Sequence, residues 1–386
     1  MNVGVGAAVI TPPNLPVRLA GFAEEQVAHE VRDDLEVRAL YLEGDAPSGG
    51  RTAVCLLVYD LLGMSRHFAD PIRVAVGAAL GLERAAVLTS CVHTHAAPST
   101  MAGTEALGWP TPEGYAELLV ERSVQAATEA QASAVAASLR YGRWPLPGGL
   151  SINRRGHPYD PTFAVLDVRA ADDAARRITS LANVSIHPVA LGPECVAVSS
   201  DWVGAFRGEL TRRDGGTPVL LSGALGDVNP HHVHRQGNEC TNDLFAEADE
   251  IGSDVAEAVD DVLARAEDLG AVAGPAVERW REVEVPTERT ALARGRGERP
   301  LRVELVEWSL GPVRLVSVPG EAFHALGRSI EEDSGRGGKV LVAGLSPVWQ
   351  GYLPMPFTEG YEEETSYGRA FVATVAAALS GATPRV

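Results

Sequence analysis

The chain is short of lysine, of paired cysteines and of long apolar runs, and each shortage excludes a class of protein. Lys339 is the lone lysine and all other basic residues are arginine, which we attribute to base composition and not to function, whereas the formal net charge of -18 argues against a nucleic-acid partner because phosphate binding needs clustered basic residues. The four cysteines show no CxxC spacing, which excludes a cysteine zinc ribbon and a thioredoxin-like site. Cys55 and Cys91 lie in apolar runs, so we expect buried free thiols there.

Signals for export or membrane insertion are also missing from the sequence. The N-terminal segment MNVGVGAAVITPP contains no basic residue and reaches a proline pair after a short apolar run, which argues against a signal peptide. No stretch approaches the roughly 18 consecutive apolar residues that span a bilayer. We therefore expect a cytoplasmic protein without a transmembrane segment. The sequence carries no indication of the oligomeric state.

Short β-branched runs alternate with Ala/Glu-rich segments of helical period along the chain. This interleaving predicts an α/β fold with mixed β-sheets flanked by helices. Because no internal repeat or low-complexity linker interrupts it, we expect a single domain over 1–386, with a surface loop at 286–299. Gly311-Pro312 predicts an antiparallel hairpin over 301–318. The expected strands are 52–59, 86–92, 162–168, 177–186, 218–221, 301–310, 313–318 and 339–345, and the expected helices are 70–80, 112–136, 203–213, 242–267, 321–333 and 365–379.

A His-x-His segment follows one of the apolar runs. Residues two apart on a strand project to the same face, so His93 and His95 are predicted to point together at the end of a sheet, where sites in α/β folds commonly lie. One imidazole could then bind a metal while the other transfers protons or contacts an oxyanion. The alternative for an isolated pair of this kind is two half-buried structural histidines.

Two further residues could complete a metal site. His187 ends another strand-like run before Pro188, and Glu321 stands where a strand turns into a helix. Each has an ordinary alternative, a hydrogen-bonded core histidine or a first-turn glutamate favoured by the helix dipole. Taken with His93, they form a set of two histidines and one carboxylate that suits catalytic zinc and leaves a position open for water. Bound zinc lowers the pKa of that water to about 7.

The order of motifs along nearly the whole chain resembles the N-terminal catalytic domain of the neutral/alkaline ceramidases and their shorter bacterial relatives. The motifs are, in order, ITPP…LAGFA (10–23), the HTH segment, the Asn153-Arg154 segment, NVSIHP (183–188), SSDWVGAF (199–206), GALGDVNPH (223–231), VPGEAF (318–323) and GYLPMPFTEGYE (351–362). The resemblance implies a ceramidase-like catalytic domain with zinc as cofactor.

The resemblance also implies a role for each matching residue. His93, His187, Glu321 and the phenol of Tyr352 would bind zinc. His95 would act as general acid/base or contact the carbonyl oxygen. Arg154 and Tyr361 would hydrogen-bond the substrate or the developing oxyanion. We expect three departures from the ceramidases that bear on the substrate: no C-terminal β-rich domain, no export signal, and a shorter loop between Tyr352 and Tyr361.

Three other polar segments are assigned lesser roles. His231, His232 and His234 follow the GDVNP loop and could provide a second metal or substrate contact, with an exposed polar loop as the alternative. Asp201 is expected to cap the helix that follows it. Residues 362–364, all glutamates, are expected to form a solvated helix start.

These observations lead to one principal hypothesis and two alternatives. The principal hypothesis is a zinc-dependent amidohydrolase, in which activated water attacks the N-acyl bond of a small or lipid-like substrate. A close alternative keeps the metal but makes the enzyme an esterase, a lactonase or an acyl transferase. The alternative from a different class is a non-catalytic binding protein on a hydrolase fold that has lost its activity.

Overall fold

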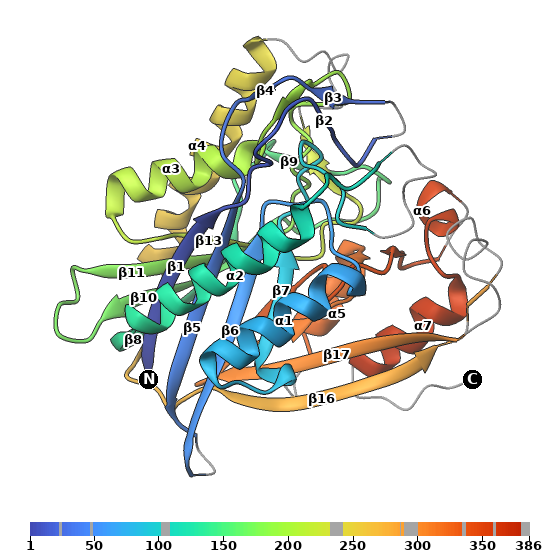
Figure 1. The fold of residues 1–386 in the computed structure, drawn as a ribbon. Coiled ribbons are helices and arrows are strands. Elements are labelled where there is room, and N and C mark those ends of the chain that lie inside the picture. The colour runs from blue at the N-terminus through green and yellow to red at the C-terminus, as the bar shows by residue number, and fades with distance from the viewer. Residues whose placement is uncertain are drawn as a thin grey trace.

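The computed structural model describes residues 1–22, 25–46, 49–101, 109–231, 242–285, 287–288, 300–333, 337–357 and 360–379. It confirms the predicted α/β architecture, with mixed sheets flanked by helices (Figure 1). Among the described residues, no helix combines the length and apolar character that a membrane span requires. The thiols of Cys55 and Cys91 are free and buried, as expected.

A curled nine-stranded sheet is the largest layer of the fold. Its central pairs are antiparallel, whereas the pairs at its two ends, β6–β7 and β11–β13, are parallel. The first and last strands of the order also contact each other, and the Ser222 hydroxyl at the end of β13 donates to the Val92 carbonyl just after β7 (2.9 Å). The carboxyl ends of these strands therefore meet. The order is β13 (Val219–Ser222), β11 (Arg177–Val184), β10 (Thr162–Ala170), β8 (Val135–Pro145), β1 (Asn2–Val9), β5 (Glu36–Asp45), β6 (Arg51–Tyr59) and β7 (Val87–Cys91), with β15 (Glu267–Gly270) beside β8.

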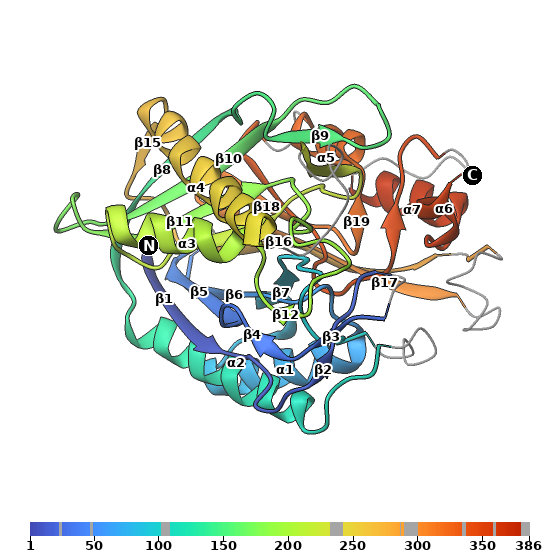
Figure 2. The ribbon, with the colours of Figure 1, turned by 90° about the horizontal axis from the view of Figure 1, so that it is seen from above.

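Helices pack over both halves of this sheet. α1 and α2 lie together over β1, β5 and β7, while α3 and α4 form a pair over β8, β10 and β13. Seen from above, α3 and α4 lie on the opposite side of the molecule from α6 and α7 (Figure 2). The helices are α1 (Arg66–Leu80), α2 (Tyr115–Ala132), α3 (Trp202–Asp214), α4 (Asn242–Ala264), α5 (His324–Glu331), α6 (Tyr361–Glu364) and α7 (Arg369–Leu379), with a 3-10 turn at Arg84–Ala86.

A second, four-stranded sheet packs against the first through β20. Asn183 joins them, because its side chain donates to the carbonyls of Leu221 and Val342 and accepts from the Val342 amide. The predicted hairpin is confirmed, with Leu310 opposite Val313 across the turn. The sheet contains β16 (Ala276–Val285), β17 (Leu301–Leu310), β18 (Val313–Ser317) and β20 (Val340–Ala343). The remaining strands form short pairs: β2 (Val17–Arg18) with β3 (Val27–Ala28), β4 (Glu30–Val31) with β12 (Ala197–Val198), β9 (Ser151–Asn153) with β14 (Val228–Pro230), and β19 (Glu321–Ala322) with β21 (Tyr352–Leu353).

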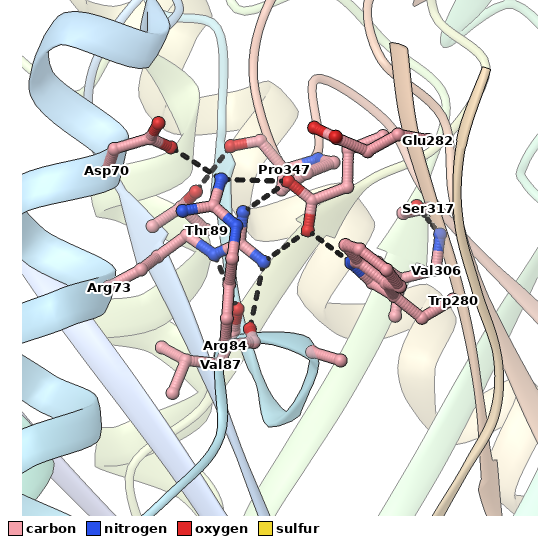
Figure 3. Close-up of polar contacts among 12 residues, drawn as sticks. Asp70, Arg73, Arg84, Val87, Thr89, Trp280, Glu282, Val306, Ser317 and Pro347 are labelled. Carbon is pink, nitrogen blue, oxygen red and sulfur yellow. Dashed lines mark hydrogen bonds and ion pairs between the residues drawn. The ribbon is translucent and has the colours of Figure 1, made fainter. Parts of the chain in front are cut away.

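A buried ion pair ties the second sheet to α1 (Figure 3). Both carboxylate oxygens of Glu304 on β17 accept from the Arg73 guanidinium, at 2.7 and 2.8 Å, and neither side chain is exposed. Arg84 and the Trp280 indole each add a hydrogen bond of 2.9 Å. A carboxylate held in this way is stable inside the protein because each of its oxygens has a donor.

Several strands differ from the sequence prediction for physical reasons. β1 is rich in glycine and alanine, and β16 turns a largely exposed, charged face to solvent, so neither shows the apolar run that predicts a strand. β5 is also missed, and the first residues of β8 were assigned to a helix that ends earlier, at Ala132. The expected surface loop at 286–299 lies almost entirely outside the described residues.

Candidate metal centre

The histidines of the candidate site stand just beyond two strands of the curled sheet. β7 ends at Cys91 and β11 at Val184, ahead of His93 and His187 respectively. The φ of His93 is 79°, which is not a strand conformation. The alternation of side chains along a strand, on which the predicted common direction of His93 and His95 was based, therefore does not apply to them. Their rings nevertheless converge, with centroids 5.1 Å apart for His93 and His95 and 5.0 Å apart for His93 and His187.

A buried carboxylate lies against two of these imidazoles. Glu321 Oε2 is 3.1 Å from His93 Nε2 and 3.4 Å from His187 Nε2. Ligand atoms held at 2.0–2.2 Å from a tetrahedral zinc ion are roughly 3.3 Å apart, so these separations fit the edges of such a tetrahedron. Ligand nitrogens of His93, His95 and His187 also lie within 4.8 Å of one another. The cluster could therefore hold a metal ion.

The remaining polar atoms of His93, His187 and Glu321 have hydrogen-bond partners that orient these side chains. Nδ1 of His93 donates to the Leu62 carbonyl and Nδ1 of His187 to the Val228 carbonyl (3.0 Å), which directs each Nε2 toward Glu321. The second oxygen of Glu321 accepts from the Trp349 indole at 2.8 Å. Burial opposes the charge of Glu321, but His93 and His187 bring the pKa of the carboxyl well below its ordinary value.

His95 differs from the other two histidines because neither ring nitrogen has a hydrogen-bond partner among the described residues. The ring of Phe22 lies 4.7 Å away, and Gly21, at φ 128°, passes so close that a Cβ there would lie 2.4 Å from His95 Nδ1. Burial, with the charges of His93 and His187, lowers the pKa of His95 well below its ordinary value. The imidazole is therefore neutral at pH 7.

Backbone pairing places a tyrosine beside the carboxylate. β19 and β21 are parallel, and Glu321 stands directly opposite Tyr352 in their register. Glu321 is thus in a short strand and not in the first turn of a helix, because α5 begins at His324. Burial, together with the charge of Glu321, raises the pKa of Tyr352 well above its usual range.

Arg154 and Tyr361 both lie near the ring of Tyr352. The Arg154 guanidinium is 5.9 Å from the ring centre of Tyr352 and donates to the Gly226 carbonyl at 2.6 Å. The Tyr361 ring is 6.0 Å from the Tyr352 ring and 63% exposed, which places it at the outer edge of the cluster. The structure therefore brings all seven predicted residues to one place, while their individual roles stay predictions.

Two buried aspartates support the loops of the site. Asp201 caps α3 as predicted, through the Trp202 amide, and it also accepts from the amides of Ala190 and Leu191, just after His187. Asp227 was not singled out by the sequence reasoning. Its carboxylate accepts from the His324 amide (2.7 Å) and from the Asn153 side chain (2.6 Å), and so joins the segments that carry Glu321 and Arg154. Its position in the GDVNP motif is the one sequence signal that could have indicated it.

Two expectations for the surrounding segments change. Glu362 and Glu363 are 2% and 6% exposed, so the predicted solvated helix start is wrong for both, although Glu364 is exposed. Arginine side chains from another loop surround these two carboxylates and make their burial possible. His231 is half-buried and belongs to no group of potential metal ligands among the described residues, while His232 and His234 lie outside that part of the chain.

Comparison with solved structures identifies the fold, whereas comparison with protein families and curated sequences finds no match. Among solved structures, a neutral ceramidase from Pseudomonas aeruginosa matches with a TM-score of 0.79 and 17% identity, over 99% of this chain and 75% of that one. A ceramidase solved in complex with C2 matches with a TM-score of 0.77 and 16% identity, over 100% of this chain and 76% of that one. The chain thus has the fold of these ceramidases.

Proposed function

We propose that the chain is a zinc-dependent hydrolase that cleaves the amide bond between an acyl group and an amine. The observation that carries this proposal is the convergence of His93 Nε2 and His187 Nε2 on one carboxylate oxygen of Glu321. Two imidazoles and a carboxylate are a ligand set of catalytic zinc. The fold shared with two ceramidases, enzymes named for an amide substrate, supports the amide as the bond cleaved.

In this proposal His93, His187, Glu321 and the phenol of Tyr352 hold the metal. Zinc, when bound, activates a water molecule and polarises the amide carbonyl. Tyr352 would lose its proton on joining the cation, since a bound cation lowers the pKa of an oxygen ligand. The carbonyl partners of His93 Nδ1 and His187 Nδ1 support this assignment, because they direct both Nε2 lone pairs into the cluster.

The remaining polar groups perform the proton transfer and bind the developing charge. His95, neutral and without a hydrogen-bond partner among the described residues, accepts the water proton as the new C–O bond forms. It then donates that proton to the amide nitrogen as the C–N bond breaks, which releases a carboxylic acid and an amine. Arg154 and Tyr361 donate to the carbonyl oxygen as it gains negative charge.

An apolar cluster beside the site supports an apolar group next to the scissile bond. Ala20, Leu62 and Met101 pack together with Trp109 and Trp349, and Trp349 also packs against the main core. The Leu62 carbonyl accepts a hydrogen bond from His93 Nδ1, and the Trp349 indole donates one to Glu321. This cluster therefore borders the site directly. A small or lipid-like N-acyl compound fits such surroundings.

Metal analysis together with paired substrates tests the proposal. We expect wild type to bind about one equivalent of zinc and to hydrolyse amides, whereas His93→Ala should lose both the zinc and more than about 99% of the activity. His29→Ala, which alters an exposed histidine, is the matched control and should resemble wild type. Faster hydrolysis of the ester with the same acyl group would favour the esterase alternative. If wild type neither binds zinc nor hydrolyses these substrates, the proposal is wrong and the non-catalytic binding protein is the remaining hypothesis.

A further inference from the structure

A buried glutamate next to Tyr361 has no role in the chemistry described above. Glu362 is the second residue of α6, a four-residue helix, yet only 2% of its surface is exposed. One of its oxygens contacts Arg154 Nη1 and the other contacts Arg155 Nη1. Burial of this carboxylate requires both cations, because a buried charge without a partner would be strongly destabilising.

The pairing restricts Arg154. Its Nη1 is held by Glu362 and its Nη2 donates to the Gly226 carbonyl at 2.6 Å, so the guanidinium is bound from two directions. A guanidinium carries five N–H donors, so the remaining hydrogens stay available for a substrate oxygen. Glu362 and the Gly226 carbonyl fix the plane of the guanidinium, and so fix the direction of its remaining N–H groups.

The same contact positions Tyr361. Because Tyr361 and Glu362 are consecutive, the pairing of Glu362 with Arg154 docks the start of α6 on the loop after β9. Glu363 reinforces the docking, with Oε1 at 3.5 Å from Arg155 Nη2. Two arginines and two glutamates balance in charge, so the docked segment is neutral as a whole.

We propose that Glu362 is a positioning residue that holds Arg154 and Tyr361 in register on one side of the metal cluster. This inference rests on the proposed function of those two residues. It assigns to Glu362 no contact with the substrate, and it predicts that the glutamate acts through Arg154.

The first test is Glu362→Gln, which keeps the side-chain shape and removes the charge, beside Glu364→Gln as an exposed control on the same helix. We expect kcat for the amide to fall by about 100-fold with little change in KM, because an oxyanion donor acts mainly in the transition state. Glu364→Gln should match wild type. A wild-type kcat in Glu362→Gln would overturn the inference while leaving the amidase proposal intact.

A double-mutant cycle separates positioning from general destabilisation. If Glu362 acts through Arg154, then Glu362→Gln should lower kcat by less than about 2-fold in an Arg154→Ala background. A further loss as large as in wild type would show that Glu362 acts by another route and would contradict the inference.

A chemical-modification experiment tests whether Glu362 holds Arg154 in place, and it does not depend on the protein being an amidase. Phenylglyoxal modifies guanidinium groups, and peptide mapping by mass spectrometry reports the rate at Arg154. We expect faster modification of Arg154 in Glu362→Gln than in wild type or Glu364→Gln, because a partner that holds the group is lost. Equal rates in the three proteins would overturn the inference.

Discussion

The indole of Trp349 is the donor to the one oxygen of Glu321 that faces away from the histidines. Partners of this kind orient a metal ligand, and their removal typically lowers metal affinity by 10- to 100-fold. We therefore expect Trp349→Phe, which keeps an aromatic ring but loses the N–H, to weaken zinc binding by about that factor. Competition with a chromophoric chelator would measure it. Trp144→Phe is the control, since that indole is exposed and packs under Arg265. An unchanged affinity in Trp349→Phe would contradict the prediction.

The start of α3 and the loop after His187 depend on one carboxylate. Asp201 accepts from three buried amides, those of Ala190, Leu191 and Trp202, and it does so with a positive φ of 60°. Asp201→Ala leaves these donors without an acceptor, and we expect the free energy of unfolding to fall by about 3 kcal/mol. Urea denaturation would measure the change.

Asp172→Ala serves as the comparison for that experiment, because Asp172 is an exposed partner of Arg176. Its removal should change the free energy of unfolding by less than about 0.5 kcal/mol. Similar decreases in the free energy of unfolding for the two variants would contradict the prediction that Asp201 stabilises the fold more than an exposed aspartate does.

The attachment of the second sheet to α1 depends on Glu304. Burial by itself raises the pKa of this carboxyl, but the hydrogen bonds and charge of Arg73, with bonds from Trp280 and Arg84, lower it to about 2. A folded-state pKa below the unfolded value stabilises the protein above the unfolded pKa. That stabilisation disappears as pH falls from 4.5 toward 2.

Wild type should therefore lose up to about 3 kcal/mol of unfolding free energy through this group between pH 5 and pH 2. Glu304→Gln should be less stable at pH 7, because Arg73 is left buried without its partner, and its stability should change less across the same pH range. Urea denaturation at several pH values would measure both curves. Parallel curves would contradict the assignment of this acid sensitivity to Glu304.

Arg154, Tyr352 and Tyr361 were indicated only by the order of motifs that resembles the ceramidases, whereas local patterns in the chain were sufficient for the fold class, the hairpin over 301–318, most helices and the histidines and Glu321 of the site. These features depend on neighbours in the sequence: apolar periodicity, a glycine-proline turn, and histidines at the ends of β-branched runs. β16 was missed for the same reason, since its exposed, charged residues give no apolar run.

Long-range contacts decided the rest. The bend of the nine-stranded sheet brings the ends of β7 and β13 together, and the two-residue pairing of β19 with β21 sets Tyr352 opposite Glu321. A two-residue strand is too short to show any periodicity, and the strand that it pairs with lies far away in the chain. The burial of Glu362 could not be predicted either, because a carboxylate is stable inside a protein only where distant cations, here Arg154 and Arg155, come to meet it.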